Sequence, residues 1–252
     1  MKRLLITFGC SWTFGVGVNY TQGISLDQFK NSAWDEVNCS CLSFRGLLSK
    51  KYNLVNRNWA CGGSSNQLQF RLAKLFFSSD EFKELQKTFD QILVLWGITS
   101  TARNEMFSID DGKLINFFYS HKSNLAKMLV NYSYSHDNEV DQLSMEMRHW
   151  NTFFKNLNIN NLWFDTFNHH HYHSENLIFD DENPRDLLSK LAIHNGFKCV
   201  DNKYHESDWT ADSDRIKNLV SCGILNPFSH HPTQLGHVQI ADMLSEYIEA
   251  SL

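Results

Sequence analysis

The sequence lacks the features that would divide it or place it in a special class. Only three prolines occur in 252 residues, and no Ser/Gly-rich stretch or run of like charges separates two halves, so we expect one domain over residues 1–252. No run approaches the roughly 18 apolar residues of a membrane span. The apolar start at Leu4 is broken at Gly9, too early for the core of a signal peptide.

Positive charge and paired cysteines are also scarce. Lysine and arginine number 23 against 28 acidic residues, a net charge of −5. This balance argues against a nucleic-acid partner held by bulk electrostatics. The six cysteines include no CxxC pair, because one residue alone separates Cys39 from Cys41. We therefore expect reduced thiols and a cytoplasmic protein.

The sequence does contain alternating strand-like and helix-like segments. Short apolar runs predict strands at 4–8, 54–59, 91–96, 162–167 and 198–201. Apolar residues at helical spacing predict helices at 43–51, 66–77, 123–132, 139–157, 185–194 and 234–251. Residues 18–40 are polar and aperiodic, which predicts a long loop. The alternation predicts an α/β fold, namely a flavodoxin-like three-layer α/β/α arrangement with a parallel sheet of about five strands.

Ligands of such sheets bind beyond the carboxyl ends of the strands, so the residues that follow each strand carry the most information. The first predicted strand runs into Gly9-Cys10-Ser11. A serine on this turn either presents a nucleophile or caps the next helix. The second strand is followed by Gly62-Gly63-Ser64-Ser65-Asn66. A glycine N–H there either stabilises an oxyanion or belongs to an ordinary turn.

Two further segments complete the series. Gly97-Ile98-Thr99 follows the third strand, where the Thr99 hydroxyl can add a donor to an oxyanion pocket. Ser229-His230-His231-Pro232 precedes the last predicted helix. A histidine held by a following proline suits a general base. His230 competes for this role, and Pro232 favours His231.

Taken together, these segments resemble the SGNH (GDSL-like) hydrolases, a family of lipases and acylhydrolases. "FGCS", "NWACGGSSN", "LVLWGITS" and "HHPTQLGH" resemble its blocks in order, from residue 4 to about 245. The detail of the motifs is similar to a divergent group found in phages and marine bacteria. The resemblance implies that Ser11 is the nucleophile and His231 the base. It also implies an oxyanion hole formed by the N–H groups of Ser11 and Gly63 with help from Thr99.

The chain departs from the family at three positions. Cys10 stands where the first block has Asp, and Thr99 stands where the third block has Asn. Phe228 stands three residues before His231, where the family has the Asp that orients the imidazole. Loss of that carboxylate typically costs about 10⁴ in rate when nothing replaces it. A Ser–His dyad can still work, or a carboxylate from another loop can serve; the candidates are Asp201, Asp208, Asp212 and Asp214.

A stretch of histidines at 168–173 follows the fourth predicted strand. It indicates either a metal site or a polar loop that faces the substrate. Metal sites are unusual in the family that the chain resembles, so we expect no metal and a substrate loop. The expected substrate contacts are Trp12, Asn66, His169, His171 and His230. Aromatic residues near this edge either stack on sugar rings or belong to the core.

Three functions remain open at this point. The first is a serine esterase without a cofactor that cleaves a small acyl ester, such as an O-acetyl group on a carbohydrate. The second is a catalytically weak or inactive carbohydrate-binding protein of the same fold, which the missing Asp and Asn favour. The third, a nucleotide-binding loop at Gly15-Val16-Gly17, is weaker, because the third glycine of GxGxxG is absent.

Overall fold

A computed structural model describes the chain except for residues 102, 109–112, 119–134, 168–173, 181–183 and 199–213. In the described part, four parallel strands form one sheet in the order β2-β1-β3-β6. The strands are β1 (Arg3–Phe8), β2 (Leu54–Asn58), β3 (Gln91–Ile98) and β6 (Asn160–Asp165). This is the order 2-1-3-4 of a flavodoxin-like sheet. The antiparallel pair β4 (Arg103–Ser108) and β5 (Lys113–Phe118) stands apart from it.

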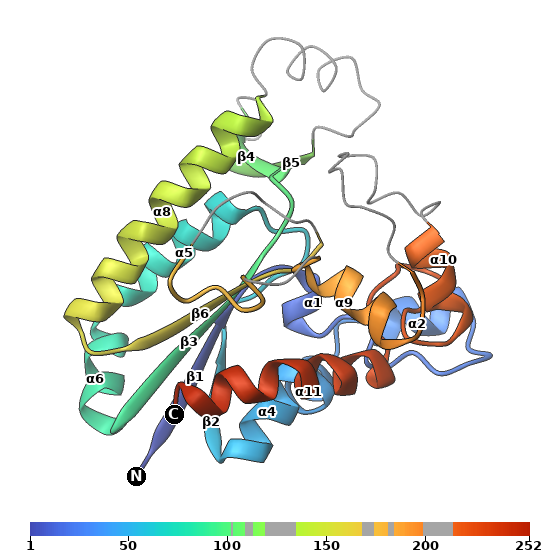
Figure 1. Ribbon diagram of the computed structural model, residues 1–252, viewed down its shortest axis with the longest axis horizontal. Coiled ribbons are helices and arrows are strands. Elements are labelled where there is room, and N and C mark those ends of the chain that lie inside the picture. The colour runs from blue at the N-terminus through green and yellow to red at the C-terminus, as the bar shows by residue number, and fades with distance from the viewer. Residues whose placement is uncertain (102, 109–112, 119–134, 168–173, 181–183, 199–213) are drawn as a thin grey trace.

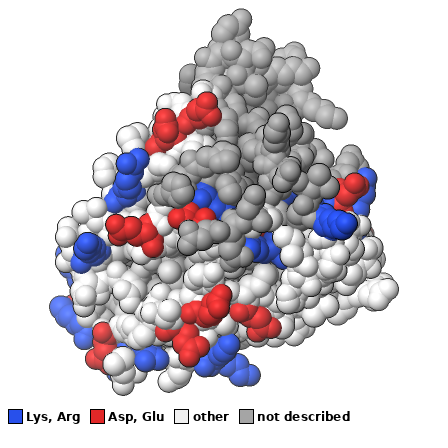
Figure 2. All heavy atoms as spheres, viewed as in Figure 1, with Lys and Arg blue, Asp and Glu red and all other residues white. Residues whose placement is uncertain are grey.

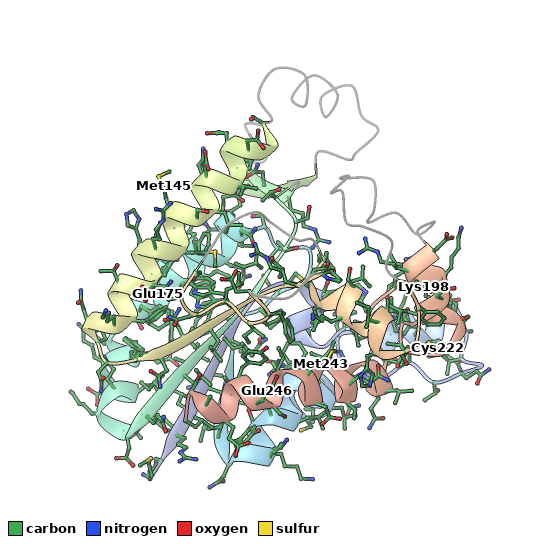
Figure 3. All side chains as sticks on the ribbon, viewed as in Figure 1. Met145, Glu175, Lys198, Cys222, Met243 and Glu246 are labelled. Atoms are coloured by element: carbon green, nitrogen blue, oxygen red, sulfur yellow. The ribbon has the colours of Figure 1, made fainter. Side chains whose placement is uncertain are left out.

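Helices cover both faces of this sheet (Figure 1). One layer consists of α5 (Asn66–Phe77), α6 (Asp80–Thr88) and α8 (His136–Asn156). The opposite layer consists of α4 (Phe44–Tyr52), α9 (Leu187–His194), α10 (Asp214–Ser221) and α11 (Gln234–Ala250). Shorter helices, α1 (Ser11–Phe14), α2 (Leu26–Ser32) and α3 (Glu36–Leu42), follow β1 along the chain. Met145 on α8 and Glu246 on α11 lie on opposite sides of the sheet (Figure 3).

The two layers arise because successive side chains of a strand point to opposite faces. Leu4, Ile6 and Phe8 of β1 pack in one core with α5, α6 and α8. Leu5 lies in the other core, with α4, α9 and α11. Both sets are buried, which is why β1 and β3 are nearly continuous apolar runs. The predicted three-layer α/β/α fold is therefore confirmed.

The sequence predictions fail in places. The predicted loop at 18–40 contains α2 and α3. Ser25 and Gln28 form a capping box at the start of α2, and Asp35 caps α3. The predicted strand at 198–201 and helix at 123–132 lie outside the described residues, apart from Lys198, which is in no strand. Four parallel strands are thus seen in the described part, against the five expected.

The hairpin β4–β5 and the helices α6 and α10 were not predicted. For the hairpin a signal exists in the sequence, because an Asp-Gly dipeptide such as that at 111–112 is typical of the loops that connect hairpin strands. None of the described helices combines the length and apolarity needed to cross a bilayer. Acidic and basic side chains are mixed over the face shown in Figure 2.

A histidine is buried where α11 packs on α4. His237 is fully buried, and the Phe44 N–H donates to its Nδ1 at 3.3 Å. Burial lowers the pKa of His237 to about 3, and the nearby His231 and Arg45 act in the same direction. The imidazole is therefore neutral in the folded chain. In the unfolded chain its pKa returns to about 6.5, so the unfolded state takes up more protons below that pH.

Stability should consequently fall as the pH drops below about 6.5. The variant His237→Gln keeps an acceptor for the Phe44 N–H but cannot take up this proton. Between pH 6 and 5 we expect the unfolding free energy of the parent to fall by about 1.2 kcal/mol more than that of His237→Gln. Urea unfolding across this range measures the slope. The exposed His149 supplies the control His149→Gln. Parallel slopes for His237→Gln and the parent would refute the assignment.

Candidate active site

Ser11 and His231 meet at the carboxyl end of the sheet. Ser11 begins α1 immediately after β1, and His231 lies in the loop before α11. Ser11 Oγ is 2.6 Å from His231 Nε2 although 220 residues separate them. The bond is short and joins a hydroxyl to an imidazole nitrogen, which is the geometry of a serine paired with a general base. His230 takes the positive φ of 56° on this loop, and it is the ring of His231 that reaches Ser11.

The turn that carries Ser11 is fastened to the neighbouring elements. The Gly9 N–H donates to Gln69 Oε1 of α5 at 2.8 Å. The Gly9 carbonyl accepts from the Ser64 hydroxyl at 2.9 Å and from the Cys61 N–H at 3.1 Å. Gly63 therefore lies one residue from an anchored side chain. Its φ is +67°, and a Cβ placed on it would meet nothing within 4 Å, so its backbone borders open space.

At the end of β3, Thr99 and Asn66 do not take the roles that the sequence predicted for them. The Asn66 side chain accepts from the Thr99 N–H and donates to the Thr99 carbonyl, both at 2.9 Å. This clamp commits the Asn66 amide to the backbone, which speaks against the expected substrate contact. Thr99 Oγ1 is enclosed and has no hydrogen-bond partner among the described residues. In this conformation it does not open toward a ligand.

Trp12 and Asp214 do not take the roles expected of them, and five other expected residues are not described by the structure. Trp12 is fully buried and meets the Phe167 ring edge-on at 5.0 Å, so it is a core residue and the expected substrate contact is wrong in this structure. Asp214 is exposed at the start of α10. The expected residues Asp201, Asp208, Asp212, His169 and His171 lie outside the described part of the chain.

The carboxylate at the end of β6 is engaged elsewhere. Asp165 is buried and forms an ion pair with Arg185 at 3.2 Å. Arg185 also contacts Asp180 at 2.9 Å. Instead of a carboxylate, Ser229 lies at the other imidazole nitrogen, with its Oγ 2.9 Å from His231 Nδ1. The sequence analysis did not assign this role to Ser229, although the residue precedes His231 by two positions.

The surroundings of His231 favour the neutral imidazole. Burial lowers the pKa of His231 to about 4, and the positive charges of Arg103 and His230 act in the same direction. A hydrogen bond of His231 to the Ser229 backbone opposes them in part. Burial also lowers the pKa of His230. A base that stays unprotonated at neutral pH can accept a proton from Ser11.

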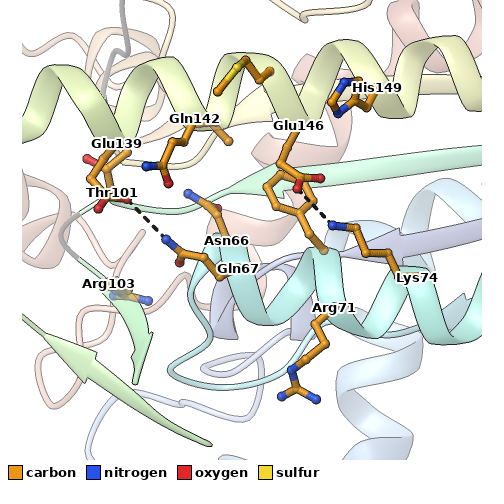
Figure 4. A pocket seen from close by; sticks show the side chains of 13 residues that line it. Asn66, Gln67, Arg71, Lys74, Thr101, Arg103, Glu139, Gln142, Glu146 and His149 are labelled. Carbon is orange, nitrogen blue, oxygen red and sulfur yellow. Dashed lines mark hydrogen bonds and ion pairs between the residues drawn. The ribbon is translucent and has the colours of Figure 1, made fainter. Parts of the chain in front are cut away.

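Arg103 links the Ser11–His231 pair to a neighbouring cavity. It begins β4, is buried, and its guanidinium lies 5.3 Å from the centre of the Phe167 ring. Burial lowers its pKa, and interaction with Cys10 opposes this. Arg103 also lines a cavity of about 530 Å³ between α5 and α8 (Figure 4). Gln67 donates to Glu139 across this cavity at 3.3 Å, and Lys74 pairs with Glu146 at 3.0 Å.

The chain was compared with known families, curated proteins and solved structures. No family model matches the sequence, and no curated protein does. A structure described as a lipolytic protein of the G-D-S-L family from Desulfitobacterium hafniense DCB-2 is 10% identical, with coverage of 98% of this chain and 99% of that one and a TM-score of 0.42. The acetyl xylan esterase Est2A from Butyrivibrio proteoclasticus is 13% identical, with coverage of 99% of this chain and 64% of that one and a TM-score of 0.47.

A third similar structure is the esterase EstA from a Pseudoalteromonas species, at 11% identity, 98% and 97% coverage and a TM-score of 0.43. All three TM-scores lie below 0.5, and all three identities lie below 15%. At such values the likeness assigns no role to any residue of this chain. The roles of individual residues depend on the geometry of this chain.

The loop that carries His231 packs closely on Gly17. Gly17 has a φ of +106°, and a Cβ on it would fall 2.4 Å from the Pro232 carbonyl oxygen and 3.0 Å from His231 Cβ. Gly223 has a φ of +76° with nothing within 4 Å of a built Cβ. Gly17 is therefore explained by close packing rather than by a nucleotide.

We expect Gly17→Ala to destabilise the chain more than Gly223→Ala. The positive φ costs about 1–2 kcal/mol for an L residue at either position. Only at Gly17 must the loop also move, and overpacking adds about 1–3 kcal/mol. Urea unfolding of both variants measures the difference. Equal losses would mean that the His231 loop does not press on Gly17.

Proposed function

We propose that this chain is a serine esterase that cleaves a small acyl ester, with an O-acetyl group on a carbohydrate as the preferred substrate. One observation carries the proposal, namely the 2.6 Å contact of Ser11 Oγ with His231 Nε2 at the carboxyl end of the parallel sheet. Ser229 at Nδ1 supports it, because an imidazole held at both nitrogens is oriented toward the serine.

The reaction proceeds by acyl transfer through a covalent intermediate. Ser11 Oγ attacks the ester carbonyl carbon while its proton passes to His231 Nε2. When the tetrahedral intermediate collapses, the bond to the alcohol oxygen breaks and that oxygen takes the proton from Nε2. Water then attacks the acyl-enzyme, with His231 again accepting and returning a proton. The products are the alcohol, the carboxylic acid and free Ser11.

The oxyanion of this intermediate requires hydrogen-bond donors. Gly63 supplies the best supported one, because its backbone borders open space beside the anchored Ser64. The Ser11 N–H is the second proposed donor. The enclosed Thr99 hydroxyl leaves the third position weak, and one missing donor typically costs about 10²–10³ in kcat. We therefore propose a slow esterase.

Labelling by a fluorophosphonate tests the Ser11–His231 pair directly. We expect covalent modification of Ser11 in the parent chain, because His231 activates its hydroxyl toward phosphorus as toward an acyl carbon. Modification should be lost in Ser11→Ala and fall at least 100-fold in His231→Ala. Mass spectrometry of the modified peptide gives the site, and the rate of labelling gives the effect.

Ser221→Ala, at the exposed end of α10, serves as the control and should label at the parent rate. Absence of labelling in folded parent protein would sink the esterase. The alternative, a catalytically inactive SGNH-like protein that binds a carbohydrate, would then be favoured.

A tryptophan beside the site supports the carbohydrate part of the proposal. Trp34 joins α2 to α3 and is 53% exposed, whereas Trp12, Trp96 and Trp163 are buried. Its ring lies 5.5 Å from that of Phe14, in the same short helix as Ser11.

The Trp34 indole also lies against Gly62, where a built Cβ would fall 2.0 Å from Trp34 Cη2. The exposed indole thus spans the two elements that carry Ser11 and Gly63. An apolar face at this place can pack on a sugar ring.

Trp34→Ala should therefore raise KM for a methyl glucoside carrying one O-acetyl group by about 5- to 10-fold, the effect of losing an interaction of about 1 kcal/mol. kcat should stay within a factor of two, because Trp34 does not contact the reacting atoms. For ethyl acetate, whose alcohol has no ring, KM should change less than twofold. Trp34→Phe is the matched variant and should keep most of the affinity. Equal effects on both esters would argue against a sugar at Trp34.

A further inference from the structure

The loop from residue 226 to 231 is organised by one buried side chain. Asn226 is fully buried, and its Nδ2 donates to the His231 carbonyl at 2.9 Å. The same carbonyl accepts from the Asn226 N–H at 2.9 Å, and the His230 N–H donates to the Asn226 carbonyl at 3.0 Å. Asn226 therefore ties both ends of the loop together and fixes the backbone position of His231.

The second polar atom of the Asn226 side-chain amide is surrounded by hydrogen-bond donors. Asn226 Oδ1 accepts from the Phe228 N–H at 3.1 Å and from the Ser229 N–H at 2.9 Å. A backbone N–H can only donate, so this atom of the amide must be its oxygen. The Ser229 hydroxyl lies 3.1 Å from the same oxygen and must donate to it.

The direction of the remaining bonds follows from this first one. Since the Ser229 hydroxyl uses its hydrogen toward Asn226, it meets His231 Nδ1 with a lone pair. Nδ1 must then carry the imidazole proton, and Nε2 must carry the lone pair. That lone pair points at Ser11 Oγ, 2.6 Å away. Two backbone N–H groups thus determine, through Asn226 and Ser229, which nitrogen of His231 can act as the base.

We propose that Ser229 and Asn226 are positioning residues that replace the carboxylate of a catalytic triad by an uncharged hydroxyl–amide relay. The relay rests on the proposed function of Ser11 and His231 and deepens it. A triad carboxylate holds the tautomer and also stabilises the imidazolium that forms during the reaction. The hydroxyl and the amide perform the first task and contribute no negative charge to the second.

The charged groups around His231 also act against the imidazolium. Arg103 faces it from β4, His230 from its own loop and His237 from α11, and each disfavours a second positive charge when protonated. Among the residues that the structure describes, no carboxylate bonds to the His231 ring. Burial and these neighbours hold the pKa of His231 at about 4. An uncharged partner at Nδ1 leaves this low pKa in place, so the base remains available in mildly acidic solution.

Substitutions at Ser229 separate positioning from charge. Ser229→Ala removes the hydroxyl acceptor for the Nδ1 proton and leaves only the interaction of His231 with the residue 229 backbone. The second tautomer should therefore become populated. We expect kcat/KM for the acetylated glucoside to fall about 100-fold with little change in KM. Ser229→Thr keeps a hydroxyl and should restore most of the rate. Ser229→Asp adds a carboxylate, which should move the acidic limb of the pH–rate profile upward by at least one pH unit.

Nitrogen chemical shifts of the His231 ring report the tautomer without any substrate. The parent chain and Ser229→Thr should show protonated Nδ1 at pH 7, and Ser229→Ala should show a mixture. Ser221→Ala controls for the loss of a serine hydroxyl elsewhere. If the tautomers respond as expected while fluorophosphonate labelling fails, the relay stands and the esterase falls. Unchanged tautomer and kcat/KM in Ser229→Ala, or an unmoved acidic limb in Ser229→Asp, would overturn the relay.

Discussion

The parallel pairing of β1 with β2 and β3 is the constraint on which the rest of the structure depends. In register, Phe8 lies beside Trp96 and Thr7 beside Asn58, so the three strands end at one edge. Because parallel strands all leave the sheet in the same direction, the turns after them gather there. The Ser11 turn, the Gly63 loop and the Thr99 segment meet for this reason. Bonds from Ser64 and Gln69 to Gly9 then hold the first two together.

The fourth contributor, His231, is placed by packing rather than by the sheet. Its loop is tied internally by Asn226 and pressed from outside by Gly17. The tightly determined loop keeps the imidazole at the serine, and no carboxylate among the described residues bonds to its ring. Such a site orients the imidazole but supplies no negative charge to stabilise the imidazolium.

The charges near His231 also act against the imidazolium. The chain carries a net charge of −5, yet the buried charge that acts on His231 is the cation Arg103. A nearby cation disfavours the imidazolium and favours a negative charge on a reacting oxygen. The proposed reaction creates both charges at once. Arg103 therefore opposes one of these charges and favours the other.

The sequence by itself determined the layers and the order of the segments at the sheet edge. Uninterrupted apolar runs such as residues 91–96 predict strands covered on both faces, and they recur between helical patterns. The SGNH-like motifs also predicted that Ser11 and His231 belong to one site, and the structure brings these two residues together. Local signals were missed at 18–40, where Ser25 and Asp35 cap helices that no apolar periodicity indicates.

Only the tertiary structure decided the partners of individual side chains. Trp12 and Trp34 look alike in the sequence, yet Trp12 is buried in the core against Phe167 and the exposed Trp34 covers Gly62. Ser229, not an aspartate, reaches His231 Nδ1 because the Asn226 amide turns the loop. Periodicity in a sequence reports which face of an element is buried. The direction of a hydrogen bond depends instead on donors and acceptors that distant segments bring within 3 Å of each other.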